Sequence, residues 1–130
     1  MKTKKNVLII TDGSGETGEM ADRIAAVLKG NTVSIKSALD FKGNDLLSAD
    51  VFFLGCEKPE PDSFNYIEDL FKHINLTGRS CGIFSPGSER TVKYLIGLVK
   101  HCEVSLNPIA LTAAVTDTES WVQKVISKSF

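Results

Sequence analysis

The chain has 130 residues, of which 42% are hydrophobic and 24% charged, a composition typical of one globular domain. Its 15 Lys and Arg residues nearly balance 16 Asp and Glu residues, and the net charge of -1 excludes a broad basic surface for nucleic acid or for an anionic membrane. The apolar run at residues 7–10 is too short for a signal peptide or a membrane span, so we expect one cytoplasmic domain over residues 1–130, with no nucleic-acid partner and no membrane.

The first half of the chain alternates between strand and helix patterns. Residues 5–11 form a short apolar run that ends at glycines, which predicts a strand buried on both faces. Apolar residues then recur at helical spacing over residues 16–29. Residues 32–37 are β-branched and alternating, as in an edge strand, and residues 51–56 form a second fully apolar run.

The second half continues this alternation. A Pro-rich loop at residues 57–62 precedes a helical pattern over residues 64–74. A third apolar run follows at residues 80–85 and is ended by a Pro-Gly pair. Apolar side chains at helical spacing then predict a helix over residues 92–100.

The last elements complete an α/β pattern. Residues 109–115 predict a fifth strand, and Asp117 or Thr118 is the natural N-cap of a final helix that carries Trp121. Five strands that alternate with four or five helices predict a three-layer α/β sandwich with a five-stranded parallel sheet of order 2-1-3-4-5. In such sheets ligands bind beyond the carboxyl ends of the strands, where the strand order reverses.

A glycine- and hydroxyl-rich loop lies at that point, after the first strand. Residues 11–18 bring backbone amides, the start of a helix and the hydroxyls of Thr11, Ser14 and Thr17 to one place, which indicates a phosphate-binding loop. The structural alternative is a tight turn in which Ser14 only caps the helix.

Two other phosphate motifs fit this loop less well. Gly13 and Gly18 have the spacing of a triphosphate-binding loop, but Glu19 stands where that motif needs a lysine. The loop also contains GxGxxG, the dinucleotide fingerprint, with Asp40 as the candidate ribose ligand. Asp40 falls beyond the expected end of the second strand and the chain is short, so the dinucleotide interpretation stays the weaker alternative.

A receiver domain of two-component signalling would have the same strand order. Such a domain needs an aspartate at the end of the third strand and a lysine at the end of the fourth. This chain has Gly55 and Cys56 at the first position and Ser85 and Pro86 at the second, so phosphoacceptor chemistry is excluded.

The loop resembles the phosphate loop of flavodoxins. That family carries Ser/Thr-x-Ser/Thr-Gly-x-Thr after the first strand, and residues 12–17 match it at Ser14, Gly15 and Thr17, with Asp12 as the departure. Further segments resemble the flavodoxin approach to strand three, the turn into strand four and the final tryptophan-bearing helix; these are residues 45–56, 75–87 and 116–125. The chain is therefore similar over its length to short-chain flavodoxins, and the expected fold is flavodoxin-like.

This resemblance implies FMN as the cofactor and places its site on three loops. The implied cofactor-binding residues are Thr11, Asp12, Gly13, Ser14, Gly15, Glu16, Thr17, Gly18, Cys56, Glu57, Lys58, Pro59, Ser85, Pro86, Gly87 and Arg90. No catalytic residue and no metal ligand is expected. Cys56 would lie at the mouth of the site, whereas Cys81 and Cys102 are expected to be buried, reduced thiols.

The loops expected around the flavin ring carry no aromatic residue, whereas flavodoxins usually cover the ring with aromatics. Phe64 or Tyr66 could fold over the ring, and Arg90 could stack on it. The competing interpretation places Phe64 in the core and pairs Arg90 with Glu89 at the surface.

Two functions follow from the resemblance. The first is an FMN-binding, low-potential electron carrier, an electron-transfer protein rather than an enzyme with its own substrate, whose protein redox partners the sequence does not identify. The second is a flavodoxin-like domain that has lost the flavin and serves as an interaction or regulatory module.

Overall fold

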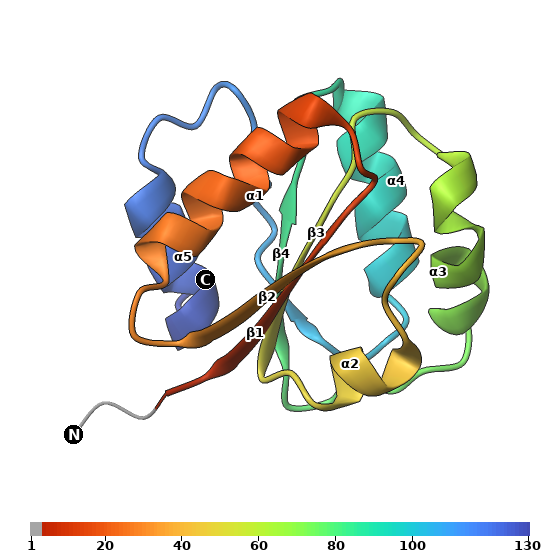
Figure 1. The fold of residues 1–130 in the computed structure, drawn as a ribbon, viewed down its shortest axis with the longest axis horizontal. Helices are drawn as coiled ribbons and strands as arrows, with labels where there is room; N and C mark the ends of the chain where they lie inside the picture. The colour runs from red at the N-terminus through yellow and green to blue at the C-terminus, as the bar shows by residue number, and fades with distance from the viewer. Residues whose placement is uncertain (1–3) are drawn as a thin grey trace.

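A computed structural model describes residues 4–130 and contains one five-stranded parallel sheet of order β2-β1-β3-β4-β5 (Figure 1). The strands are β1 (Asn6–Thr11), β2 (Thr32–Ser37), β3 (Val51–Gly55), β4 (Ser80–Phe84) and β5 (Ser105–Leu106). The helices are α1 (Gly15–Val27), α2 (Gly43–Leu47), α3 (Asn65–Leu70), α4 (Glu89–Val99) and α5 (Thr118–Ser127), with a 3₁₀ turn at Asp62–Phe64. The predicted strand order and three-layer architecture are confirmed.

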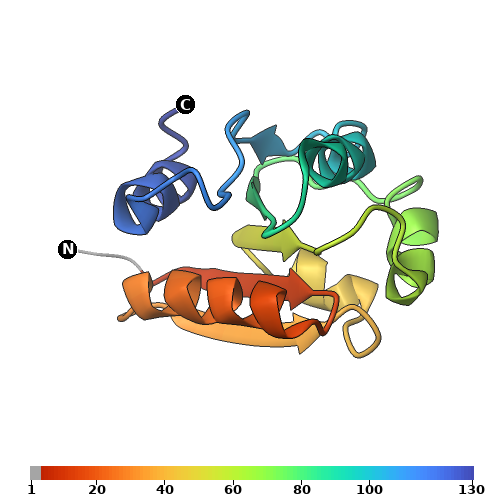
Figure 2. The ribbon, with the colours of Figure 1, turned by 90° about the horizontal axis from the view of Figure 1, so that it is seen from above.

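The apolar strands β1, β3 and β4 bury side chains on both faces of the sheet, because successive residues point to opposite sides. Helices α1 and α5 cover one face, and α2, α3 and α4 cover the other (Figures 1 and 2). Ile9 and Phe53 pack in the core beneath α1 and α5, whereas Leu8 and Phe52 pack in the core beneath α2, α3 and α4. Strand β2 is only partly buried, as expected for an edge.

Two helical segments differ from the sequence expectation. The pattern over residues 64–74 gives a shorter helix, α3, which begins after the 3₁₀ turn and ends at Leu70. Helix α2 has five residues and was not expected, because so short an element shows no periodicity. No helix within residues 4–130 is long and apolar enough to cross a membrane.

The fifth strand was placed wrongly by the sequence. Strand β5 is Ser105–Leu106, and of the predicted residues 109–115 only Leu111 pairs with the sheet, through a bridge to Phe84. The chain bulges between these two contacts. The amide of Ile109, which would be next in the ladder to donate to the Ile83 carbonyl, donates to Asn107 Oδ1 at 3.0 Å, and the amide of Leu111 donates to Ile83 in its place.

The last helix begins where expected. Asp117 is its N-cap and accepts a hydrogen bond from the Ser120 amide at 2.9 Å. Trp121 packs against Phe53 with ring centroids 5.7 Å apart, and its Nε1 donates to the Ile109 carbonyl at 2.8 Å. Trp121 is therefore a packing residue that also holds the bulge after β5.

Candidate functional site

Three loops meet beyond the carboxyl ends of β1, β3 and β4, at the end of the sheet where α1 and α4 begin (Figure 1). They are loop one (residues 11–18), loop two (residues 56–60) and loop three (residues 85–91), and each contains residues that the sequence assigned to a site. Hydrogen bonds between side chains of one loop and the backbone of another join all three.

Loop one is built as a helix cap. Ser14 is the N-cap of α1, and its Oγ accepts a hydrogen bond from the Thr17 amide at 3.3 Å and donates to Thr17 Oγ1 at 2.7 Å. The Thr11 hydroxyl accepts from the amide of Gly13 at 3.2 Å. Gly13 has a φ of 87°, a left-handed conformation that glycine adopts without steric cost. The capping role that the sequence offered as an alternative is thus present.

The cap leaves part of loop one available to a ligand. Within residues 4–130, the amides of Gly15 and Glu16 donate to no protein acceptor, and both residues are exposed. These amides lie in the first turn of α1, where the helix dipole favours negative charge. Together with the hydroxyl of Thr11, and with that of Ser14 when it turns from Thr17 to the ligand, they can bind one phosphate group.

Asp12 points inward and bridges loop one to loop two. Its Oδ1 accepts from the amide of Ser14 at 2.9 Å, and its Oδ2 accepts from the amide of Glu57 at 2.8 Å. The side chain is half-buried. The residue that departs from the flavodoxin pattern is therefore the residue that joins the two loops.

Two hydroxyls of loop three donate hydrogen bonds to the backbone of loop two. Ser85 Oγ donates to the Cys56 carbonyl at 2.7 Å, and Thr91 Oγ1 donates to the Glu57 carbonyl at 3.1 Å. Gly87 lies against the same carbonyl, and a Cβ atom at this position would overlap the Glu57 oxygen. Glu57 is therefore bound through its N–H to loop one and through its C=O to loop three.

Cys56 does not lie open at the mouth of the site. Its side chain is buried, and its Sγ donates to the Lys58 carbonyl at 3.2 Å. Burial, with a smaller contribution from the Asp12 charge, raises the pKa of the Cys56 thiol to about 12. The thiol is therefore protonated at neutral pH and a poor nucleophile.

No family model matches the sequence, and no curated protein matches it. Solved structures do match the fold. Flavodoxin 2 from Bacillus cereus has a TM-score of 0.80 at 18% identity, with 95% of this chain and 99% of that chain covered. A short-chain flavodoxin associated with a bacterial microcompartment gives 0.79 at 15% identity, covering 98% and 100%. The flavodoxin of Fusobacterium nucleatum bound to flavin mononucleotide gives 0.71 at 14% identity, covering 97% and 99%.

The chain has the flavodoxin fold. Its loops one, two and three are the loops that follow β1, β3 and β4 of that fold, at the reversal of strand order where ligands of open α/β sheets bind. The likeness spans nearly the whole chain, so the proteins compared differ little in size.

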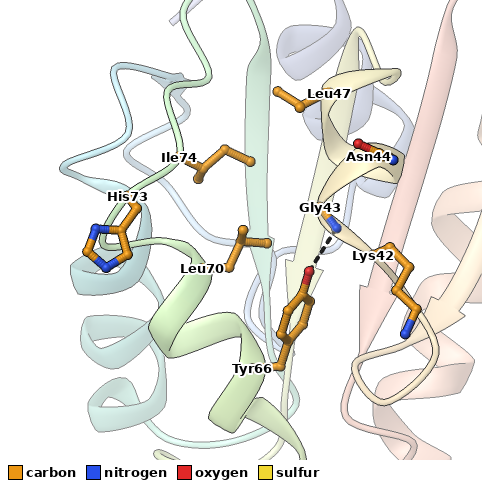
Figure 3. A pocket seen from close by; sticks show the side chains of 8 residues that line it. All are labelled: Lys42, Gly43, Asn44, Leu47, Tyr66, Leu70, His73 and Ile74. Carbon is orange, nitrogen blue, oxygen red and sulfur yellow. Dashed lines mark hydrogen bonds between the residues drawn. The ribbon is translucent and has the colours of Figure 1, made fainter.

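Neither aromatic side chain proposed to cover a ligand ring lies where it could do so. Phe64 is fully buried in the core below α3 and α4. Tyr66 faces α2, where its hydroxyl accepts a hydrogen bond from the Gly43 amide at 2.9 Å (Figure 3). It lines a separate groove of about 510 Å³ between α2 and α3, with Leu47, Leu70 and Ile74.

The remaining candidate residues lie at the rim of the loops. Lys58, Gly87 and Arg90 are exposed, whereas Pro59 and Pro86 are half-buried. Arg90, in the first turn of α4, forms no ion pair with Glu89 or with any other described carboxylate, so the surface pairing that the sequence offered as an alternative is not formed. Among residues 4–130, no group of His, Cys, Asp or Glu has the arrangement of a metal site.

Sequence reasoning missed Thr91, which is fully buried and holds the Glu57 carbonyl. A signal for it exists. Residues 85–91, SPGSERT, share with residues 11–17, TDGSGET, a hydroxyl at the first position, a glycine at the third, a serine at the fourth and a threonine at the seventh, so Thr91 corresponds to Thr17.

Proposed function

We propose that the chain binds FMN at loops one, two and three and acts as a low-potential electron carrier in the cytoplasm. The observation that carries this proposal is the start of α1. There the exposed amides of Gly15 and Glu16 lie beside the hydroxyls of Ser14 and Thr11, in a chain with the flavodoxin fold. A solved flavodoxin of this fold is bound to flavin mononucleotide, which supports the same ligand here.

The proposed roles divide between the two ends of the flavin. Residues 11–18 would hold the phosphate through amides and hydroxyls. Loops two and three, with Cys56, Glu57, Lys58, Pro59, Ser85, Pro86, Gly87 and Arg90, would border the ring. Bound FMN supplies the group that takes up and releases electrons. Glu57, Glu60 and Glu89 in or beside these loops disfavour negative charge on a ring, which favours a low reduction potential.

Titration of the purified protein with FMN and with riboflavin tests the proposal. We expect FMN to bind at least about tenfold more tightly, because removal of the phosphate removes charge-assisted hydrogen bonds worth about 1.5–3 kcal/mol each. NAD is the control for the dinucleotide alternative. Equal binding curves for FMN and riboflavin, or binding of NAD without FMN, would contradict the proposal.

One observation favours the second function, a domain without flavin that serves as an interaction or regulatory module. Loops two and three contain no aromatic side chain, and their hydroxyls at Ser85 and Thr91 are already bonded to the backbone of loop two. Stacking on an aromatic ring is thus not available from these loops. Purified protein that is colourless and takes up no flavin on reconstitution would support this second function.

A further inference from the structure

Asp12 lies between two segments that are far apart in the sequence. Its two carboxylate oxygens accept hydrogen bonds from the Ser14 amide at 2.9 Å and from the Glu57 amide at 2.8 Å. The first bond belongs to loop one and the second reaches loop two, so the carboxylate fixes the distance between the proposed phosphate end and ring end of the site.

The peptide that Asp12 holds is fixed at both of its polar atoms. The N–H of the Cys56–Glu57 peptide donates to Asp12, and its C=O accepts from Ser85 Oγ at 2.7 Å. The next carbonyl, of Glu57, accepts from Thr91 Oγ1 at 3.1 Å. Removal of the Asp12 acceptor would release the N–H side of this peptide while its carbonyl side stays bound.

Among residues 4–130, no basic side chain forms an ion pair with Asp12. Among the described residues the ion pair within 4.0 Å is Lys36–Asp45, on the β2 side of the molecule. Within residues 4–130, the donors to the Asp12 carboxylate are the amides of Ser14 and Glu57. A phosphate bound by the neighbouring amides of loop one would experience this negative charge, because Ser14 is the N-cap of the helix whose first-turn amides are free.

We propose that Asp12 is a positioning and specificity-determining residue of this site, which locks the Cys56–Glu57 peptide and weakens the preference of loop one for a phosphate-bearing flavin. The phosphate part of this proposal rests on the proposed binding of FMN. The lock is a property of the protein alone and can be measured without any flavin.

Two substitutions separate the charge from the lock. Asp12→Asn removes the charge, keeps the shape of the side chain and retains one acceptor oxygen for one of the two amides. Asp12→Glu keeps the charge and moves it by one methylene group. For each variant and the wild type, the dissociation constants of FMN and riboflavin are measured at low and high salt, and hydrogen exchange of the Glu57 amide is followed by NMR in the flavin-free protein.

In Asp12→Asn we expect the ratio of riboflavin to FMN dissociation constants to rise by about tenfold at low salt and by less at high salt, because only FMN carries the phosphate and salt screens its charge. In Asp12→Glu we expect this ratio to stay near the wild-type value. The Glu57 amide should exchange at least about tenfold faster in Asp12→Glu than in the wild type, because the displaced carboxylate no longer meets it.

An unchanged ratio in Asp12→Asn would overturn the role toward phosphate. Unchanged exchange of the Glu57 amide in both variants would overturn the lock. Should neither the wild type nor any variant bind either flavin, the FMN proposal fails together with the role toward phosphate, and the exchange measurement still decides the lock.

Discussion

Loops one and three begin alike in sequence and in local geometry. Residues 11–17 and 85–91 each have a hydroxyl first, a glycine third, a serine fourth and a threonine seventh. In both, the first hydroxyl accepts from the amide of the glycine, at 3.2 Å for Thr11 and 2.9 Å for Ser85. In both, the threonine is fully buried in the first turn of the following helix.

The two loops differ in what their side chains bind. In loop one, Ser14 and Thr17 bond to each other, and only Asp12 reaches another loop. In loop three, Ser85 and Thr91 both bond to the backbone of loop two. The hydroxyls of loop three therefore hold a neighbouring loop, whereas those of loop one remain grouped around the start of a helix.

The same residue types can thus cap a helix or join two loops, and the difference depends on which backbone groups lie within hydrogen-bonding distance. Loop three lies against the carbonyls of Cys56 and Glu57, which need donors, and hydroxyls supply them. Loop one faces the amide of Glu57, which needs an acceptor, and Asp12 supplies it. Pro86 stands at the position that corresponds to Asp12 and has no polar side-chain atom.

The two equivalent glycines allow the sharpest test of this difference. A Cβ at position 87 would overlap the Glu57 carbonyl oxygen, so Gly87→Ala should lower the free energy of unfolding by about 1–3 kcal/mol. Gly13→Ala meets no atom within 4 Å but must adopt a φ of 87°, which costs about 1 kcal/mol. Urea unfolding measures both effects.

Gly97→Ala is the matched control for these variants. Gly97 lies within α4, and an added Cβ meets nothing within 4 Å, so the substitution should stabilise the protein by about 0.5–1 kcal/mol through helix propensity. If Gly87→Ala unfolds at the same urea concentration as the wild type, loop three does not pack against Glu57 as described.

The two buried threonines give a smaller effect. Thr91→Val keeps the shape of the side chain but leaves the Glu57 carbonyl without its donor, which should cost about 1–2 kcal/mol. Thr17→Val removes only the acceptor of the half-buried Ser14 hydroxyl, which can bond to water, so the cost should stay below about 1 kcal/mol. Thermal unfolding of both variants compares them, and equal losses would contradict the different roles of the two hydroxyls.

The sequence predicted those parts of the fold in which local pattern and tertiary role agree. The strands β1, β3 and β4 show this agreement, because a strand that is buried on both faces needs apolar residues throughout. Helix α1 shows it too, because its buried residues recur at helical spacing. The fifth strand was misplaced because residues 109–115 have the composition of a strand, whereas the Asn107 side chain accepts the hydrogen bond of the Ile109 amide and so interrupts the pairing with β4. The strand propensity of residues 109–115 does not indicate such a side-chain hydrogen bond.

Within the candidate site, the sequence predicted the loops but not their connections. The cap at Ser14 follows from a local motif. The bond from Asp12 to Glu57 joins residues 45 positions apart, and the bond from Thr91 to Glu57 joins residues 34 apart, so no local pattern contains either. Phe64 and Tyr66 could not be assigned to a ring site or to other packing from their spacing alone, and the structure turns both away from the loops.

The smallest expected effect is the contribution of Cys56 to the pH dependence of the unfolding free energy. Cys56 belongs to the peptide whose N–H donates to Asp12 of loop one and whose carbonyl accepts from Ser85 of loop three. Burial and the Asp12 charge raise the pKa of this thiol from 9.0 to about 12. Because the unfolded chain loses the proton first, the contribution of Cys56 to stability is complete below pH 9 and is lost as the pH rises from about 9 toward 12. Relative to Cys56→Ala, the wild type should lose about 0.8 kcal/mol more of its unfolding free energy between pH 8 and pH 9.5, measured by urea unfolding under reducing conditions. Burial also raises the pKa of Cys81 and Cys102, and the comparison cancels their contribution because both proteins contain them.

In Asp12→Asn the Cys56 thiol should react with iodoacetamide at lower pH than in the wild type, because the negative charge that opposes its ionisation is gone. If alkylation of Cys56 has the same pH profile in Asp12→Asn and in the wild type, the carboxylate does not act on the thiol, and burial alone sets its pKa.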